Sequence, residues 1–365
     1  MPRRDPFTTS LLGWFDHHGR DLPWRGIQDP YRIWLSEIIL QQTRVAQGID
    51  YWRRFVERFP DVQSLAEASE DEVLKLWQGL GYYSRARNLH TAARQIVALG
   101  RFPNTFDEIK QLKGVGDYTA AAIASFAFHL PVAAVDGNAY RVLARVFGID
   151  TPINTTQGKR LFTELAQSLL LVDRPHDFNQ AMMDFGATLC TPSSPNCGGC
   201  PLVNRCEAYR YNKVEALPVK EKKLKVKTRH FIYIYLRCQG QVPIHRRPAG
   251  DIWQGLYEPL MIEWGCEEQT DKASIENFSD SPSEAQSLQA IERFLAAPFT
   301  SVRVVCRGLR HVLTHRVIIA DCFLIETDSR PVLPDSYFWI DEADLDRYAV
   351  PRLVERMLEE VGKVE

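Results

Sequence analysis

The sequence lacks any uninterrupted apolar run of the roughly 20 residues that a membrane-spanning helix needs. Met1 to Asp21 alternates charged with apolar residues, unlike the core of a signal peptide. An excess of charge of one sign is also missing, because 44 Lys and Arg face 46 Asp and Glu. Any basic surface that binds nucleic acid must therefore be confined to part of the molecule. We expect a cytoplasmic protein that makes no membrane contact and keeps its thiols reduced.

The pattern of apolar residues changes once along the chain and divides it into two predicted domains. Residues 1–212 show helical spacing, and we expect them to form an all-α domain. Residues 213–229 read as a basic interdomain linker, since VKEKKLKVKTRH contains one acid. Residues 230–365 combine strand-like and helical segments and predict an α+β domain. The predicted strands are Phe231 to Cys238, Val302 to Cys306 and Val317 to Ile325, and the acidic segment from Glu263 to Glu284 is the expected mobile loop.

The stretch from Leu112 to Asn138 combines a glycine turn with a later carboxylate. Gly114 and Gly116 precede an Ala-rich helical run, and Asp136 follows it. Glycines before a helix let the backbone approach a ligand and direct N–H groups at it, which suits a phosphate. The alternative is a structural corner with Asp136 as an ordinary helix cap. Spacing alone leaves both interpretations open.

A second carboxylate, Glu37, lies on the apolar face of a predicted helix from Pro30 to Val45. Ile33, Trp34 and Ile38 occupy the same stripe. Burial of a carboxylate is costly and raises its pKa, which suits a general acid near neutral pH. The alternative is a Glu at the rim of the apolar face or one paired with an arginine. We expect Gln41, Gln42 and Thr43 to continue this helix.

Aromatic and basic residues recur at breaks in the helical pattern. Two tyrosines follow the glycines of the Gly79 to Tyr83 segment and could wedge between stacked bases, although packing onto a neighbouring helix is the commoner role. Trp24 and Arg25 form a similar pair in a loop, where a surface packing contact is the commoner role. Arg141 and Arg145 lie one turn apart on a later helix, and we expect them on its solvated face.

Four of the eight cysteines fall within 17 residues, spaced Cys-x6-Cys-x2-Cys-x5-Cys. Reduced thiols at this density indicate a metal centre, because disulfides would not persist in a reducing compartment. Four thiolates suit zinc or an iron–sulfur cluster, and the uneven spacing favours the cluster. The other four we interpret as buried thiols. The predicted ligands are Cys190, Cys197, Cys200 and Cys206; the predicted buried thiols are Cys238, Cys266, Cys306 and Cys322.

These motifs together resemble a known family. LKGVG-D with a downstream VDGN is similar to the helix–hairpin–helix and catalytic Asp of the base-excision DNA glycosylases, and the cysteine spacing is their cluster-loop pattern. LPWR, SEIILQQTRV, GLGYYSRARNL and FNQAMMDFGATLCTP extend the resemblance to adenine DNA glycosylases of the MutY type, densely over residues 7–210. The family pattern implies a six-helix barrel over about 27–133. It also implies a cluster subdomain, built from the N-terminal helix and about 134–212, with one 4Fe-4S cluster, and a Nudix-like domain over 230–365.

The resemblance implies a role for each matching residue. Glu37 would protonate adenine N7, and Asp136 would stabilise the oxocarbenium ion, the two-carboxylate logic of glycosidases. Tyr118 and Asn138 would support these two groups, and Gly114 and Gly116 would contact the DNA backbone. The residues implied to contact the bases are Arg20, Trp24, Arg25, Leu40 and Gln180 around the flipped adenine, Gln42 and Tyr82 inserted into the duplex, and Thr314 and His315 at the 8-oxoguanine.

Four departures from related patterns sharpen the expectation. Lyases of the same superfamily carry a nucleophilic Lys where this chain has Tyr118, so the resemblance implies base removal without strand cleavage. Leu313 and Thr314 stand where the family commonly has Phe-Ser. The R-E-x-x-E-E core of a true Nudix hydrolase is absent. Lys113 replaces the usual Pro of the hairpin, and we expect it to add a phosphate contact.

The expected function is therefore removal of adenine mispaired with 8-oxoguanine or G, by a monomer acting on double-stranded DNA. In bacteria such a protein would associate with the nucleoid when bound to DNA. Three alternatives stay open: a glycosylase/lyase for damaged pyrimidines, a lesion-binding protein without catalysis, and a nucleotide hydrolase in residues 230–365.

Overall fold

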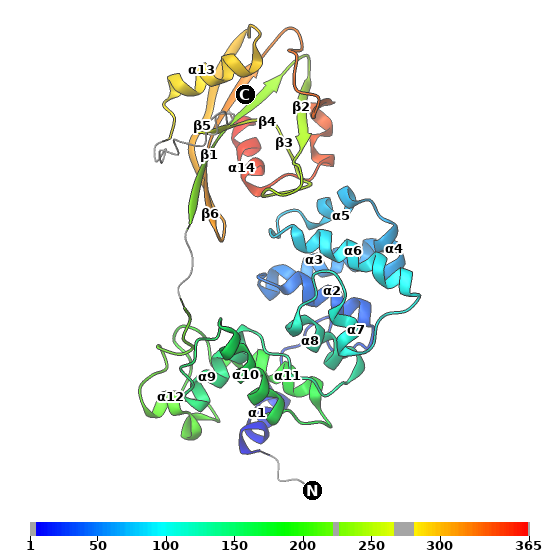
Figure 1. Ribbon diagram of the computed structural model, residues 1–365, viewed down its shortest axis with the longest axis vertical. Helices are drawn as coiled ribbons and strands as arrows, with labels where there is room; N and C mark the ends of the chain where they lie inside the picture. The colour runs from blue at the N-terminus through cyan, green and yellow to red at the C-terminus, as the bar shows by residue number, and fades with distance from the viewer. Residues whose placement is uncertain (1–4, 222–225, 266–280, 364–365) are drawn as a thin grey trace. The chain divides into compact units, whose positions relative to one another are not determined.

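The computed structural model describes residues 5–221, 226–265 and 281–363 (Figure 1). They belong to two compact units: Met1–Ala68 with Asn88–Lys222, and Ser69–Arg87 with Lys223–Glu365. Residues 222–225 of the predicted linker, most of the predicted mobile loop (266–280), and Cys266 lie outside the described residues. The segment 69–87 groups with the second unit, although its sequence runs within the helical domain.

The first unit is helical, as predicted. Side chains of Asp5, Asp29, Thr105, Asp136 and Thr155 cap five of its helices by accepting a hydrogen bond from a backbone N–H of the first turn. Its helices are α1 (Pro6–His18), α2 (Pro30–Leu40), α3 (Val45–Arg58), α4 (Val62–Glu67), most of α6 (Ser84–Leu99), α7 (Phe106–Lys110), α8 (Asp117–Phe128), α9 (Gly137–Phe147), α10 (Thr156–Leu169), α11 (Pro175–Asp184) and α12 (Glu207–Arg210), with a π-helical turn over Phe185–Leu189.

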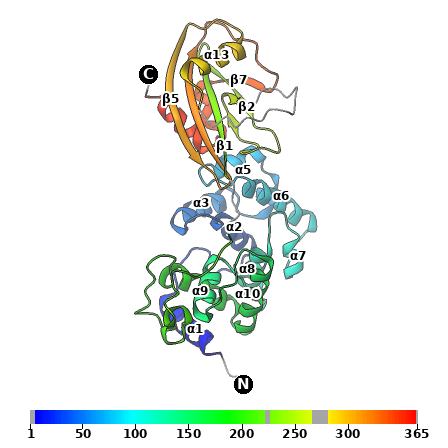
Figure 2. The same cartoon turned by 60° about the vertical axis from the view of Figure 1, so that its left-hand side comes forward.

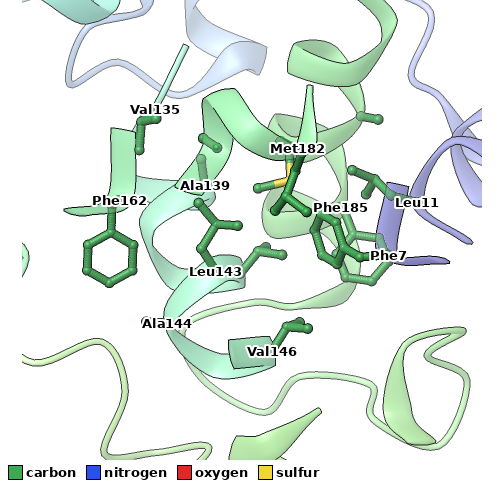
Figure 3. Close-up of a cluster of buried hydrophobic side chains, with 14 of the residues drawn as sticks. Phe7, Leu11, Val135, Ala139, Leu143, Ala144, Val146, Phe162, Met182 and Phe185 are labelled. Carbon is green, nitrogen blue, oxygen red and sulfur yellow. The ribbon is translucent and has the colours of Figure 1, made fainter. Parts of the chain in front are cut away.

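A buried cluster around α9 holds one part of this unit together (Figure 3). Ala139, Leu143 and Val146 recur at helical spacing on α9 and place one apolar stripe inward. Phe7 and Leu11 of α1 join the same cluster, as do Met182 and Phe185 at the α11 end, so segments from both ends of the domain pack together. The packing fixes the N-terminus of α9, where Asp136 lies.

The predicted continuation of the second helix to Val45 is wrong. α2 ends at Leu40, and α3 begins at Val45. Gln42 takes a positive φ of 59°, the left-handed region that a helix cannot contain. The amide side chains of Gln41 and Gln42 therefore stand in a turn between two helices.

The second unit contains a four-stranded sheet in the order β4-β1-β6-β5, of which Figure 2 labels β1 and β5. Strands β1 (Lys227–Arg237) and β6 (Arg316–Glu326) are parallel, while β4 (Leu260–Trp264) and β5 (Ser301–Val312) flank them in antiparallel pairs. A second sheet has the order β3-β2-β7, from β3 (Tyr257–Glu258), β2 (Gln241–Arg246) and β7 (Tyr337–Asp341). The fold class is thus confirmed: a helical domain followed by an α+β domain.

The alternation of side chains along β1 explains how two helices cover the four-stranded sheet. Phe231, Tyr233 and Tyr235 join one core with α14 (Arg352–Val361), whereas Ile232 and Ile234 join another with α13 (Glu284–Leu295). Both faces of the strand are buried, as expected for a parallel pair covered on two sides. β1 begins at Lys227, three residues inside the segment read as linker.

Residues 69–87 contact the α+β part of their own unit. The segment contains α5 (Glu70–Trp77) and the start of α6 (Ser84–Leu99). The Tyr257 hydroxyl donates to Asp71 Oδ2 at 2.9 Å, and the Arg87 guanidinium donates to the Gln254 carbonyl at 2.6 Å. The segment from Gly79 to Tyr83 therefore belongs to the second unit.

Two of the predicted buried thiols, Cys238 and Cys322, are buried, and Cys306 is half-buried. No helix among the described residues is both long and apolar enough to cross a membrane.

Candidate active site

The glycine turn joins α7 to α8 as a hairpin whose backbone is exposed. Gly114 has a φ of +78°, and a Cβ built on it would lie 2.6 Å from the Asn88 Cβ, so the position requires glycine. Gly116 is the N-cap of α8 and places no side chain over the helix N-terminus. The Lys113 N–H donates to Gln95 Oε1 at 2.7 Å, a bond that the proline it replaces could not make. The hairpin thus presents backbone to solvent, as an anion site requires.

Glu37 is buried on α2, with 6% of its surface exposed. The Tyr118 hydroxyl, from the first turn of α8, donates to Glu37 Oε2 at 2.8 Å. Burial raises the pKa of Glu37 to about 7; the negative Asp136 acts in the same direction, while the Tyr118 bond and the positive Arg25 oppose the rise. The carboxyl group is therefore close to half protonated at neutral pH, which suits a general acid.

Asp136 is at once a helix cap and the second carboxylate of the site. Its Oδ1 accepts from the Ala139 N–H at 2.7 Å, and its Oδ2 accepts from the Asn138 side-chain amide at 2.8 Å. Burial raises the pKa of Asp136, and these donors and Arg141 oppose the rise. Because Asp136 raises the pKa of Glu37, the two carboxylates lie close enough to interact electrostatically. The interpretations as cap and as catalyst are therefore compatible.

Tyr118 distinguishes this site from one that uses an amine as the nucleophile. Burial and the nearby carboxylates of Glu37 and Asp136 raise the pKa of its hydroxyl well above the ordinary value. It is therefore a neutral phenol at physiological pH and serves as a hydrogen-bond donor. Its oxygen also lies 3.9 Å from the Met183 sulfur of α11.

Arg20 and Arg25, predicted to line a base pocket, share one buried partner that the sequence analysis missed. Arg20 Nε and Arg25 Nη2 donate to Asp184 Oδ1 at 2.7 and 2.8 Å. Although burial raises the pKa of Asp184, the hydrogen bonds from Arg25 and Arg20 outweigh it and lower that pKa. Asp184 occupies a buried position on α11, so the reasoning that identified Glu37, a carboxylate among apolar positions, would have found it.

The other residues predicted to surround the adenine come from three elements. Trp24 is buried and packs edge-on against Trp52 of α3, with ring centroids 5.9 Å apart. Leu40 ends α2 and packs on Gly48, whose missing side chain makes room for it: a Cβ there would lie 2.7 Å from Leu40 Cδ2. Gln180 is half-buried on α11. Because Trp24, Leu40 and Gln180 lie on different segments, their shared role around the adenine stays a prediction.

Two residues predicted to enter the duplex share an unusual backbone conformation. Gln42 in the first unit and Tyr82 in the second have φ values of 59° and 47°. Such values are uncommon outside glycine and carry strain that concentrates at functional positions. Both side chains are exposed, Tyr82 to 52%.

Within the second unit, Tyr82 contacts one of the residues predicted to recognise the lesion. Its hydroxyl lies 3.0 Å from Thr314 Oγ1, and either oxygen can be the donor. Thr314 and His315 are exposed in the tight turn between β5 and β6, closed by the bond from Leu313 N–H to the Arg316 carbonyl at 2.8 Å. Tyr82, which is predicted to insert into the duplex, and Thr314, which is predicted to contact the 8-oxoguanine, thus form one polar contact.

The expectation that Arg141 and Arg145 face solvent is wrong. Both are buried on α9. Arg141 donates to Asn138 Oδ1 and to the carbonyls of Gly186 and Cys190, each at 2.7 Å. Arg145 donates to Thr191, Pro192 and Leu217 carbonyls and approaches Cys190 Sγ at 3.4 Å. Backbone carbonyls from distant segments compensate the burial of these guanidinium groups.

The four predicted cluster ligands line one cavity, together with Arg145, Phe185 and Tyr209. Burial, with a contribution from the other three sulfurs, raises the pKa of Cys200 to about 11, against the effect of a backbone hydrogen bond from Leu202. Such thiols become thiolates when a metal coordinates them. Backbone N–H groups of Leu202 and Tyr209 lie at Cys200 and Cys206 and suit thiolate acceptors. The donor set therefore fits a group with four thiolate ligands.

Zinc and an iron–sulfur cluster require different spacings of the four thiolates. Among the described residues, no three His, Cys, Asp or Glu side chains are close enough to hold one metal ion. Thiolates bound to one zinc at about 2.3 Å would lie only about 4 Å apart. A cluster places its own iron and sulfide between the thiolates and so needs them farther apart.

Comparison with known proteins matches both parts of the chain. Residues 35–168 match the HhH-GPD superfamily of base excision DNA repair proteins, and residues 232–360 match the NUDIX domain. The chain is 46% identical to the adenine DNA glycosylase of Mus musculus over 56% of this chain and 42% of that one, and 38% identical to that of Buchnera aphidicola (strain Bp) over 69% and 72%. It is 30% identical to that of Schizosaccharomyces pombe over 95% and 87%. The matched part is thus less than half of the mouse protein.

Solved structures resemble the helical part of the chain. A thermostable thymine-DNA glycosylase superposes with a TM-score of 0.53 at 32% identity, covering 56% of this chain and 95% of that one. An endonuclease III bound noncovalently to DNA superposes with a TM-score of 0.50 at 20% identity, covering 56% and 94%, which supports the fold.

Proposed function

The chain belongs to the adenine DNA glycosylase family of the HhH-GPD superfamily, and from this we propose that it hydrolyses the glycosidic bond of adenine mispaired with 8-oxoguanine or G in double-stranded DNA. The observation that carries the proposal is the buried Glu37, whose pKa is raised to about 7 and whose carboxyl group is held by Tyr118 beside Asp136. The product is an abasic site with an intact backbone.

Glu37 supplies the proton that the leaving base needs. The anion of adenine is a poor leaving group, and protonation at N7 lets the base depart neutral. A carboxyl group with a pKa of about 7 keeps a substantial protonated fraction at physiological pH. The Tyr118 bond to Oε2 orients the carboxyl group and leaves Oε1 to face the substrate. After departure, the carboxylate accepts a proton from the attacking water.

Asp136 stabilises the positive charge that develops on the sugar. As the bond to N9 breaks, the sugar acquires oxocarbenium character, and a nearby carboxylate lowers the energy of that state. Ala139 N–H and the Asn138 amide hold both oxygens of Asp136 in place. Arg141 in turn holds Asn138, so the carboxylate needs little reorganisation during the reaction.

The proposal requires that adenine leave the duplex, because its N9 is inaccessible in stacked DNA. Gln42 and Tyr82 are suited to fill the gap, since each projects an exposed side chain from a left-handed turn. Gly114 and Gly116 offer backbone N–H groups to a phosphate at the N-terminus of α8. Trp24, Leu40 and Gln180, with Arg20 and Arg25, remain the proposed surroundings of the flipped base.

The neutral phenol at Tyr118 supports a glycosylase over a glycosylase/lyase. A lyase needs an amine to form a Schiff base with the sugar, and this position offers none. Water is then the nucleophile, and the DNA strand stays whole.

We further propose that Cys190, Cys197, Cys200 and Cys206 hold one 4Fe-4S cluster. When bound, such a cluster cross-links four points of the segment 190–206. Arg145 would then tie that segment to α9 through Cys190 Sγ and the carbonyls of Thr191 and Pro192. In this proposal residues 1–212 carry catalysis, and residues 230–365 use Thr314 and His315 to read the opposite base.

A single-turnover assay tests the proposed substrate. The full chain is incubated with duplexes that differ only in the base opposite A, and adenine release and strand cleavage are followed separately. We expect release opposite 8-oxoguanine and G, with no strand cleavage before base treatment. Glu37→Gln should bind the same duplex without releasing adenine. Substantial strand cleavage by the wild-type protein would favour the lyase, and unchanged activity of Glu37→Gln would exclude our assignment of the acid.

A further inference from the structure

Two histidines that the proposed reaction does not use approach each other at the surface of the first unit. His129 is the C-cap of α8, and His176 lies in the first turn of α11. Their Nδ1 atoms are 3.2 Å apart, and their ring centroids are separated by 4.7 Å. His129 is exposed, and 34% of the His176 side chain is exposed, so solutes can reach both rings.

The distance between the two nitrogens matches the geometry of a shared metal ion. Imidazole nitrogens bind zinc at about 2.0–2.1 Å, and tetrahedral coordination then places two of them about 3.4 Å apart. The observed 3.2 Å differs from this by a few tenths of an ångström. A hydrogen bond between the rings has a similar length, so the distance must be joined to a second observation.

The second observation is the support behind His176. Its Nε2 lies 3.3 Å from Asp177 Oδ1, and Arg174 Nε donates to the other oxygen of Asp177 at 2.6 Å. A carboxylate that accepts the proton of one ring nitrogen leaves the lone pair of the other for a metal, which is how metal-binding histidines are commonly oriented.

We propose that His129 and His176 form a binding site for one divalent transition-metal ion of the Zn²⁺, Ni²⁺ or Cu²⁺ class, with Asp177 orienting His176. Imidazole suits these ions. Among the described residues no group of three protein ligands is close enough to one ion, so water completes the coordination. For both Nδ1 atoms to bind the metal, each neutral ring must carry its proton on Nε2.

The ion would join the end of α8 to the start of α11. The same junction already contains Asn179 of α11, which accepts from the Ala134 N–H at 2.9 Å and donates to Ser125 Oγ at 2.9 Å. A metal bridge would add a second tie between the helix that carries Tyr118 and the helix that carries Gln180. Binding should therefore stabilise the folded first unit.

Titration of the full chain as purified tests the site with two probes, Cu²⁺ and Zn²⁺. Electron paramagnetic resonance of one equivalent of Cu²⁺ should show coupling to two nitrogens. Zn²⁺ at about a hundred times its dissociation constant should raise the Tm by roughly 5 °C or more. His176→Gln and His129→Asn should each weaken binding at least tenfold, and Asp177→Asn by roughly tenfold to a hundredfold. Asn suits position 129 because it tolerates the φ of 54° there.

His17→Gln is the matched control, since His17 is an exposed histidine of α1. It should bind both ions as the wild type does. The proposal is overturned if His176→Gln keeps the wild-type affinity, or if the bound Cu²⁺ shows sulfur ligation or fewer than two nitrogens. None of these outcomes depends on glycosylase activity, so they test the metal site separately from the proposed reaction.

Discussion

Glu37→Gln should make the protein more stable at alkaline pH while abolishing adenine release. The folded structure raises the pKa of Glu37 from the ordinary value of 4.5 to about 7. At about 1.4 kcal/mol per pH unit, that difference corresponds to about 3 kcal/mol. Glutamine keeps the shape and an oxygen for the Tyr118 bond, but it never acquires the buried charge. On the proposed mechanism, the carboxylate of Glu37 is thus retained at a cost in stability.

The sign of the pH dependence follows from the direction of the shift. A carboxyl group with a raised pKa binds more protons in the folded state than in the unfolded state. Its favourable contribution is complete below about pH 4.5 and is lost as the pH rises through about 7. The variant should therefore be within about 1 kcal/mol of the wild type near pH 5 and exceed its free energy of unfolding by about 3 kcal/mol at pH 8.

Urea unfolding at pH 5 and pH 8 measures this difference, with tryptophan fluorescence as the signal. Glu57→Gln provides the control, because Glu57 is exposed on α3 and its replacement should change neither stability nor its pH dependence. If Glu37→Gln and the wild type differ by the same amount at both pH values, Glu37 is not a carboxyl group with a raised pKa, and the argument for it as the general acid fails.

Three further substitutions test other contacts. Tyr118→Phe removes the hydrogen-bond donor that lowers the pKa of Glu37. The alkaline limb of the pH–rate profile for adenine release should therefore shift to higher pH by about one unit, and the maximal rate should fall. Asp184→Asn leaves two buried arginine contacts without a charged partner and should cost about 3–5 kcal/mol in urea unfolding. Thr314→Val removes the hydroxyl that contacts Tyr82. It should reduce the preference for 8-oxoguanine over G in single-turnover rates by roughly twofold to tenfold, whereas Thr314→Ser should preserve that preference.

Periodicity alone predicts features whose cause lies within one element. Glu37 shares a helical stripe with Ile33 and Trp34, so its burial follows from spacing once the helix is accepted. The β-branched and aromatic run from Phe231 to Cys238 likewise predicts a strand, and the structure shows both of its faces buried by separate helices. The resemblance to a family adds roles that spacing cannot assign, such as the exclusion of an amine mechanism at Tyr118.

Features that depend on distant segments are not predictable in this way. Arg141 and Arg145 carry charges that ordinarily favour solvent, and they are buried because carbonyls between Gly186 and Leu217 accept their hydrogen bonds. The sequence has no glycine or proline that would mark the end of α2 at Leu40. The residue that takes the left-handed conformation there is Gln42. In both cases the deciding partner or conformation belongs to the tertiary structure.

Asp136→Asn separates the two roles of the residue that the spacing left ambiguous. Asp136 caps α9 through the bond from the Ala139 N–H, and asparagine is about as good an N-cap as aspartate. If Asp136 were only a cap, the variant would keep both its stability and its activity. If its charge stabilises the oxocarbenium ion, stability should stay within about 1 kcal/mol while the single-turnover rate falls at least a hundredfold. Loss of the negative charge should also lower the pKa of Glu37, because Asp136 raises it. A shift of the alkaline limb to lower pH in the pH–rate profile of the remaining activity would identify this coupling. An unchanged rate would mean that Asp136 is only a helix cap.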